Sequence, residues 1–208
     1  AGSSVMTYTV TGTGSCSSVT ATANRTVTIT AAPVAGTLSG TEEICSNGTT
    51  TFSSDVTGGA WSSATASVAT IDETSGEVTV VGAGSSVMTY TVTGTGGCSN
   101  ATATRTVTVT APPSAGTLSG TEEICTTGTT TFSSSVSGGS WSSATPSVAT
   151  IDETSGEVTV VGAGSSVMTY TVTGTGGCSN ATATRTVTVT APPSAGTLSG
   201  TEEICTTG

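Results

Sequence analysis

The chain of 208 residues contains no lysine, no histidine and no glutamine, and its only cationic side chains are three arginines. Thirteen carboxylates outweigh them, so the formal net charge is −10. A nucleic-acid binder needs a basic surface that neutralises phosphates and releases counterions, and this composition does not supply one. Anionic membrane surfaces attract basic segments for the same reason. We therefore expect no nucleic-acid partner and no membrane insertion within these residues.

The missing residue types also exclude the most familiar catalytic groups. Without histidine or lysine, the chain cannot form a Ser/His/Asp triad, a Cys/His dyad or a Schiff-base lysine. The carboxylates within residues 152–157 have the residue types that a general acid and a general base require. The same turn recurs at residues 72–77, however, which is more typical of a solvated turn in a repeated unit. We therefore predict that the protein is not an enzyme.

Aromatic residues are scarce, at 3% of the chain, and charged residues make up only 8%. Serine, threonine and glycine fill much of the sequence, a composition that also occurs in disordered, mucin-like stalks. Residues 181–190, ATATRTVTVT, instead place threonine at every second position, with alanine, arginine or valine between. This period of two is the pattern of a half-buried β-strand. The alternation predicts a folded, strand-rich protein.

The chain is a tandem array. Residues Ala83–Gly128 recur without change at Ala163–Gly208, an offset of 80 residues, and residues 35–82 differ from 115–162 at only six positions. A fixed period of this length is typical of a repeated domain. We expect this sequence to be a section of a longer array. The predicted division is the C-terminal part of a repeat at 1–34, complete repeats at 35–114 and 115–194, and the N-terminal part of the next repeat at 195–208.

Each complete repeat contains short apolar runs separated by glycine-rich turns about every ten residues, and none of these runs has a helical period. This spacing is typical of an all-β sandwich or barrel. One phenylalanine, one tryptophan and one tyrosine per repeat are the expected aromatic core. These residues are Phe52, Trp61, Tyr90, Phe132, Trp141 and Tyr170.

The order of Trp141, SVATID, GEVTVVGAG, SSVMTYTV and a final TVTVT resembles the bacterial immunoglobulin-like group 2 domains. Such domains occur in intimin- and invasin-type adhesins and in giant surface proteins. The ICxxG and GGC stretches resemble, more narrowly, cysteine-containing repeats of large secreted proteins in the Bacteroidota. The resemblance implies tandem immunoglobulin-like β-sandwiches of about 80 residues each. It brings no shared active site.

Two cysteines recur in each repeat, one after the sequence EEI (Cys45, Cys125, Cys205) and one after a glycine-rich turn (Cys16, Cys98, Cys178). No CxxC spacing and no histidine are present, which argues against zinc. Two cysteines per repeat predict one disulfide within each repeat, Cys45 with Cys98 and Cys125 with Cys178. Cys16 and Cys205 would then pair outside this sequence. The alternative pairing joins the last hairpin of one repeat to a neighbouring repeat.

Arg105 and Arg185 fall on the Ala/Val face of their predicted strands, where an unpaired charge would be costly. A bulge would turn the side chain away, whereas a carboxylate partner would neutralise it. A planar guanidinium suits such a partner. We predict structural ion pairs that draw on the acidic pair at the start of each repeat, Glu42, Glu43, Glu122 and Glu123.

Acidic residues and glycosylation sequons are the remaining candidate sites. The sequence signal for calcium is weak. The candidate ligands are Asp72, Asp152 and Glu157, but the sequence DETSGE lacks the DxDxDG pattern of a dedicated calcium loop. We expect no cofactor, with Ca²⁺ as the only candidate. Asparagines that begin N-x-S/T triplets are possible glycosylation sites. They are Asn24, Asn47, Asn100 and Asn180.

The function predicted from these features is structural. Disulfides indicate an extracellular or cell-surface location. The linkers at 31–36, 111–116 and 191–196 contain proline, which restricts the backbone. The repeats should therefore form a filament or a rod-like stalk, with copies of the protein itself as partners. The alternative is a surface adhesin that binds carbohydrate or another ligand, and an exposed tryptophan would favour it.

Overall fold

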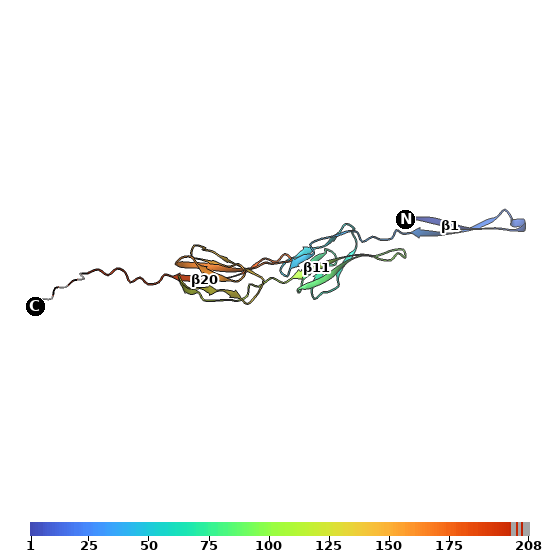
Figure 1. The fold of residues 1–208 in the computed structure, drawn as a ribbon. Helices are drawn as coiled ribbons and strands as arrows, with labels where there is room; N and C mark the ends of the chain where they lie inside the picture. The colour runs from blue at the N-terminus through green and yellow to red at the C-terminus, as the bar shows by residue number, and fades with distance from the viewer. Residues whose placement is uncertain (201–202, 204, 206–208) are drawn as a thin grey trace. The chain divides into compact units, whose positions relative to one another are not determined.

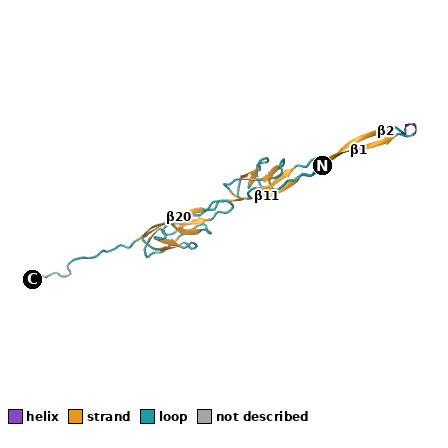
Figure 2. Cartoon of the chain, turned by 90° about the horizontal axis from the view of Figure 1, so that it is seen from above, coloured by secondary structure: helices purple, strands orange, loops and turns teal. Residues whose placement is uncertain are grey.

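The computed structural model describes residues 1–200, 203 and 205. In this part of the chain the regular elements are β-strands, apart from one short 3-10 turn, η1 (Gly14–Cys16) (Figure 2). The all-β prediction is therefore confirmed. The chain folds as two compact units. Unit 1 contains Ala1–Pro112 and Thr175–Cys178, and unit 2 contains Pro113–Gly174 and Ser179–Gly208. A short loop of the second sequence repeat thus belongs to unit 1, and the predicted repeat boundaries remain predictions.

Unit 1 begins with a hairpin of two ten-residue strands, β1 (Gly2–Thr11) and β2 (Thr20–Ile29) (Figure 1). The strands are antiparallel, with Gly2 opposite Ile29. Every residue of both strands is solvent-exposed. The hairpin therefore has the alternation of a half-buried sheet while its apolar face remains uncovered.

The first complete repeat contains a four-stranded sheet in the order β4-β11-β10-β7. These strands are β4 (Glu43–Cys45), β11 (Ala101–Thr110), β10 (Gly84–Val92) and β7 (Ala60–Ser63). β4 runs parallel to β11, with Cys45 beside Thr110, while the other pairs are antiparallel. The parallel register carries Cys45 to the carboxyl end of β11.

Shorter strands complete this repeat. They are β5 (Thr50–Thr51), β9 (Glu77–Val80) and β8 (Ala69–Ile71) in one sheet, and β3 (Leu38–Ser39) with β6 (Ser53–Ser54) in another. Val78 of β9 and Ala69 of β8 join the same buried cluster as residues of β10 and β11. The two layers therefore enclose a single core, as in an immunoglobulin-like sandwich.

The second complete repeat has the same architecture, as its near-identical sequence requires. Its four-stranded sheet has the order β13 (Glu123–Cys125), β20 (Ala181–Thr190), β19 (Gly164–Val172), β16 (Ser140–Ser143). The remaining strands are β14 (Thr130–Thr131), β18 (Glu157–Val160), β17 (Ala149–Ile151), β12 (Leu118–Ser119) and β15 (Ser133–Ser134). Cys125 again lies beside the last residue of the long strand, Thr190.

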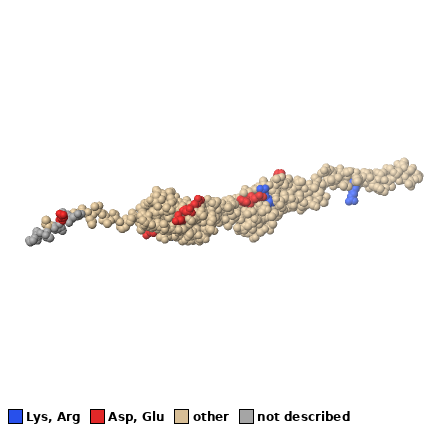
Figure 3. Space-filling view, in the orientation of Figure 1, with Lys and Arg blue, Asp and Glu red and all other residues tan. Residues whose placement is uncertain are grey.

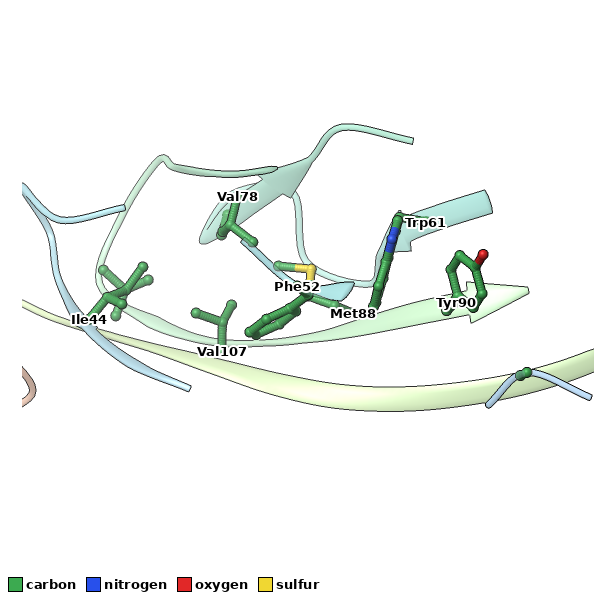
Figure 4. Close-up of a cluster of buried hydrophobic side chains, with 10 residues drawn as sticks. Ile44, Phe52, Trp61, Val78, Met88, Tyr90 and Val107 are labelled. Carbon is green, nitrogen blue, oxygen red and sulfur yellow. The ribbon is translucent and has the colours of Figure 1, made fainter. Parts of the chain in front are cut away.

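The core is built around three aromatic side chains and the apolar faces of the long strands (Figure 4). Phe52 is fully buried, and the Trp61 ring lies between it and Tyr90, with ring centroids 6.1 Å and 4.9 Å apart. The equivalent residues Phe132, Trp141 and Tyr170 are buried in the second repeat. Such tilted aromatic contacts add to the free energy gained from burial.

A hydrogen-bonded tyrosine fixes one edge of this core. The Tyr90 hydroxyl donates to the Val56 carbonyl and accepts from the Gly59 N–H, both at 2.8 Å. Gly59 must be glycine, because a Cβ there would overlap the tyrosine ring. The ring is therefore buried while its polar group remains satisfied.

Candidate functional site

The structure contains a disulfide between Cys45 and Cys178, with sulfur atoms 2.03 Å apart and Cα atoms 4.8 Å apart. Both cysteines belong to unit 1, although they lie 133 residues apart and in different sequence repeats. The predicted pairings within a repeat, Cys45 with Cys98 and Cys125 with Cys178, are therefore wrong. The alternative pairing, from the last hairpin of one repeat to the neighbouring repeat, describes the observed bond.

The physical reason is that the two cysteines of one repeat lie at opposite ends of the same long strand. Cys98 lies in the turn before β11, whereas Cys45 pairs with Thr110 at the end of β11. A ten-residue strand is about 30 Å long at about 3.3 Å per residue. A disulfide requires Cα atoms within about 7 Å. A bond within the repeat would therefore require the sheet to come apart.

A glycine-rich loop brings Cys178 to its partner. Gly176 and Gly177 have positive φ angles of 58° and 77°, a conformation that favours glycine. A Cβ on Gly176 would also overlap the hydroxyl of Thr110, so the loop approaches the end of β11 closely. The Cys178 Sγ lies 3.4 Å from the Thr110 carbonyl oxygen. The loop therefore docks where β4 and β11 end together.

The other four cysteines are free thiols in the described part of the chain. Cys16, Cys125 and Cys205 are exposed, and Cys98 is half-buried. The predicted pairing of Cys16 and Cys205 outside this sequence remains a prediction. Cys98 is the counterpart of Cys178, and its Sγ lies 3.7 Å from the Thr30 carbonyl oxygen at the end of the β1–β2 hairpin.

Arg105 of β11 and Arg185 of β20 each have a carboxylate close by. Arg105 Nε lies 3.3 Å from Glu42 Oε1, and Arg185 Nε lies 3.4 Å from Glu122 Oε1. In each repeat, the arginine therefore lies next to the first of the two glutamates that were predicted as partners. Neither Nε has an aligned hydrogen bond, and the glutamates are half-exposed, so these ion pairs are weak.

Backbone carbonyls bind the arginine more directly than the glutamate does. Arg185 Nη1 donates to the Leu118 carbonyl at 3.1 Å and Nη2 to the Gly120 carbonyl at 2.7 Å. The guanidinium carbon also lies 5.8 Å from the centre of the Phe132 ring. The side chain therefore ties the first strand of the repeat to the long strand β20.

Replacing Arg185 by methionine should lower the free energy of unfolding by about 1–3 kcal/mol, because the Leu118 and Gly120 carbonyls lose their charged donor. Glu122→Gln should cost at most about 1 kcal/mol, since a half-exposed ion pair contributes little. Urea unfolding of both variants measures the difference. A larger loss for Glu122→Gln would show that the ion pair, rather than the carbonyl contacts, is the main interaction.

The acidic turn considered for calcium is an internally hydrogen-bonded turn. The Asp152 carboxylate accepts hydrogen bonds from the Ser155 N–H at 2.7 Å, the Ser155 hydroxyl at 2.8 Å and the Thr154 N–H at 3.1 Å. Asp72 makes the same contacts in the first repeat. Within residues 1–200, 203 and 205, no group of three or more acidic or cysteine side chains is arranged to hold a metal ion.

These hydrogen bonds predict a pH effect. The Ser155 backbone N–H, with further hydrogen bonds from the Ser155 hydroxyl and the Thr154 N–H, holds the pKa of Asp152 below its ordinary value of 3.8. Similar contacts lower the pKa of Asp72. A lowered pKa in the folded state stabilises the fold above the unfolded-state pKa, and this contribution is lost as pH falls through the folded value. Thermal unfolding at pH 7 and pH 2 should show a smaller loss of Tm in the Asp72→Asn/Asp152→Asn double variant than in the parent chain. An equal loss would contradict this role.

The surface offers few charged groups, as the visible face in Figure 3 shows. The four candidate glycosylation residues, Asn24, Asn47, Asn100 and Asn180, are all exposed. An open depression recurs in both repeats, lined in the first by Phe52, Thr57, Gly58, Trp61, Thr74 and Tyr90 among others. Trp61 is only 6% exposed, so its ring serves the core and leaves little surface for a ligand to stack on.

Residues 127–175 match the family model of the intimin immunoglobulin-like domain. The match lies within the second repeat and supports its resemblance to the immunoglobulin-like domains of bacterial surface adhesins. No curated protein sequence matches the chain. Among the described residues, no helix is long and apolar enough to cross a membrane.

The solved structures that match this chain share little sequence with it. The C-terminal 282-residue fragment of intimin, in complex with the intimin-binding domain of the translocated intimin receptor, has 15% identity and a TM-score of 0.46 over 74% of this chain. This chain spans 63% of that fragment. Domains 1–6 of the surface layer protein SbsC have 15% identity and a TM-score of 0.35 over 92% of this chain and 35% of theirs. A SusE-like, surface-located polysaccharide-binding protein from the heparin utilisation locus of Bacteroides thetaiotaomicron has 15% identity and a TM-score of 0.27, over 66% and 30% of the two chains.

Proposed function

We propose that this chain is part of a structural extracellular protein in which immunoglobulin-like repeats form a filament or a rod-like stalk. One observation carries the proposal. The loop Thr175–Cys178 of the second repeat belongs to unit 1, and Cys178 is bonded there to Cys45. Two consecutive repeats are thereby joined by a covalent bond in addition to the chain itself. Such a bond suits a protein that must carry load along its length.

Other features support the same role. The repeats are nearly identical, so each junction can repeat the previous one. A disulfide of this kind is expected outside the cytoplasm. The match of residues 127–175 to an adhesin domain agrees with a cell-surface location. The cysteine-containing repeats also resemble those of large secreted proteins in the Bacteroidota.

A load-bearing role can be tested by pulling single molecules from their two ends. With the bond intact, the residues between Cys45 and Cys178 cannot extend when unit 1 and unit 2 unfold. Reduction should release a loop with a sequence separation of 133 residues, which adds about 450 Å of extension at about 3.4 Å per residue. If reduction adds no extension, the bond does not bypass this part of the chain and the load-bearing proposal fails.

A surface adhesin is the second candidate function. It is favoured by the match of residues 127–175 to the intimin domain and by the open depression that recurs in both repeats. Electron microscopy of the protein on its native cell surface separates the two functions. Uniform fibres with an axial repeat support the filament. Isolated tethers that end in a distinct head would favour the adhesin.

A further inference from the structure

The β1–β2 hairpin exposes side chains that are buried in the core of the complete repeat. Its sequence GSSVMTYTV is identical to that of β10, yet Met6 is 60% exposed and Tyr8 is 71% exposed. Their counterparts Met88 and Tyr90 are 0% and 5% exposed. The same side chains are therefore covered in one copy and open in the other.

In the complete repeat, the side chains that cover Met88 and Tyr90 come from one continuous segment, residues 35–82. Its side chains Phe52, Trp61 and Val78 pack against Met88, as Figure 4 shows for the buried cluster. The same segment supplies β4, which pairs with β11 through Glu43 beside Thr108 and Cys45 beside Thr110. In the described residues, β2 pairs with β1 alone, so its other edge is open.

Cys98 marks the same place by a second, independent observation. The Cys98 Sγ lies 3.7 Å from the Thr30 carbonyl oxygen. In the same way, the Cys178 Sγ lies 3.4 Å from the Thr110 carbonyl oxygen. Thr30 occupies in the hairpin the position that Thr110 occupies in the repeat. A Cβ on Gly96 would overlap Thr30, as one on Gly176 would overlap Thr110. The loop of the first repeat is therefore docked in the same way, next to the position at which Cys45 stands in the bonded case.

We propose that the β1–β2 hairpin and Cys98 form one docking site, and that its occupant is a further copy of the segment 35–82. The occupant covers Met6 and Tyr8, adds a parallel strand beside β2 and places its EEIC cysteine against Cys98. By the same rule, Cys125 bonds the loop cysteine of a following repeat. The observed Cys45–Cys178 bond is then one link in a series. The inference rests on the proposed structural role and names the partner at each junction.

Closing the bond oxidises two thiols. The Cys98 sulfur and the sulfur of the occupant form one S–S bond and lose two protons and two electrons. Oxidised glutathione accepts them by thiol–disulfide exchange, in which its own S–S bond breaks and two glutathione thiols leave. An extracytoplasmic compartment can supply such a disulfide donor.

The test extends the full chain by one segment. A copy of residues 35–82 is fused directly before Ala1, which completes a third repeat, and the protein is refolded with oxidised and reduced glutathione. Free thiols are then blocked with iodoacetamide, and trypsin cleaves after Arg25, Arg105 and Arg185. We expect the new N-terminal fragment to be linked by a disulfide to fragment 26–105, with Cys98 fully protected. In the unextended chain, Cys98 should be fully alkylated.

A matched control separates docking from bonding. The same extension with the added copy of Cys45 replaced by serine should still shield Tyr8 from tetranitromethane, while Cys98 stays reactive. The proposal would be overturned if Cys98 were alkylated in the extended chain that keeps the added cysteine, or if Tyr8 reacted in either extended chain as it does in the unextended chain. Covalent dimers of the unextended chain through Cys98 would also overturn it. None of these outcomes depends on whether fibres form on cells, so the filament proposal is tested separately.

Discussion

Replacing Cys45 by serine should lower the free energy of unfolding of unit 1 by about 2–5 kcal/mol, because the Cys45–Cys178 bond is lost. The sequence separation of 133 residues closes a very long loop, which in the chain-entropy model restricts the unfolded state by about 5 kcal/mol. A domain is stable by only about 5–15 kcal/mol, so this loss is a large fraction of the stability of unit 1. Guanidinium unfolding without reductant measures the loss.

Cys125→Ser is the matched control. Cys125 is the counterpart of Cys45 at the end of β13, but its thiol is free and exposed. Its replacement should change stability by no more than about 0.5 kcal/mol. Reductant should bring the parent chain to the level of Cys45→Ser and leave that variant unchanged. Equal losses in the two variants would contradict the observed connectivity.

Replacing Met168 by alanine should cost unit 2 about 2–5 kcal/mol. The side chain is fully buried in the core of the second repeat, so its removal loses burial and leaves a cavity. Because unit 2 has only a few large core side chains, its neighbours cannot readily fill the space. Chemical denaturation followed by the fluorescence of Trp141, which is buried in the same core, reports the change.

The sequence provides a control with the same local context. Met6 lies in an identical stretch of β1 but is 60% exposed. Met6→Ala should therefore change stability by no more than about 0.5 kcal/mol. A comparable loss in both variants would show that the strand sequence, rather than the sandwich around it, determines the cost.

The strands and the core could be predicted because their signals are local. The alternation of ATATRTVTVT follows directly from the two faces of a strand, and Val187 and Val189 are buried as that pattern requires. The three aromatic residues of each repeat are buried because few other side chains are large enough to fill a sandwich. The proximity of Arg185 to Glu122 could also be predicted, because a charge on the core face needs a nearby partner. The Leu118 and Gly120 carbonyls, which accept the hydrogen bonds of Arg185, have no such signal in the sequence.

The disulfide could not be predicted from the same signals, since its geometry depends on pairing between distant segments. The sequence shows that each repeat has two cysteines, but it does not show that these cysteines lie at opposite ends of the long strand, which is β11 in the first complete repeat. That follows from the parallel pairing of β4 with β11, which places Cys45 beside Thr110. It also depends on the close approach of Gly176 to Thr110, which no residue pattern within a single repeat reveals.

The connectivity of the disulfide tests this account most directly. Trypsin can cut only after Arg25, Arg105 and Arg185, so fragment 26–105 carries Cys45 with Cys98 and fragment 106–185 carries Cys125 with Cys178. The protein is unfolded with iodoacetamide, digested without reductant and weighed by mass spectrometry. We predict one species in which fragments 26–105 and 106–185 are joined, with Cys98 and Cys125 alkylated. Two separate fragments, each with an internal disulfide and no alkylation, would contradict the account.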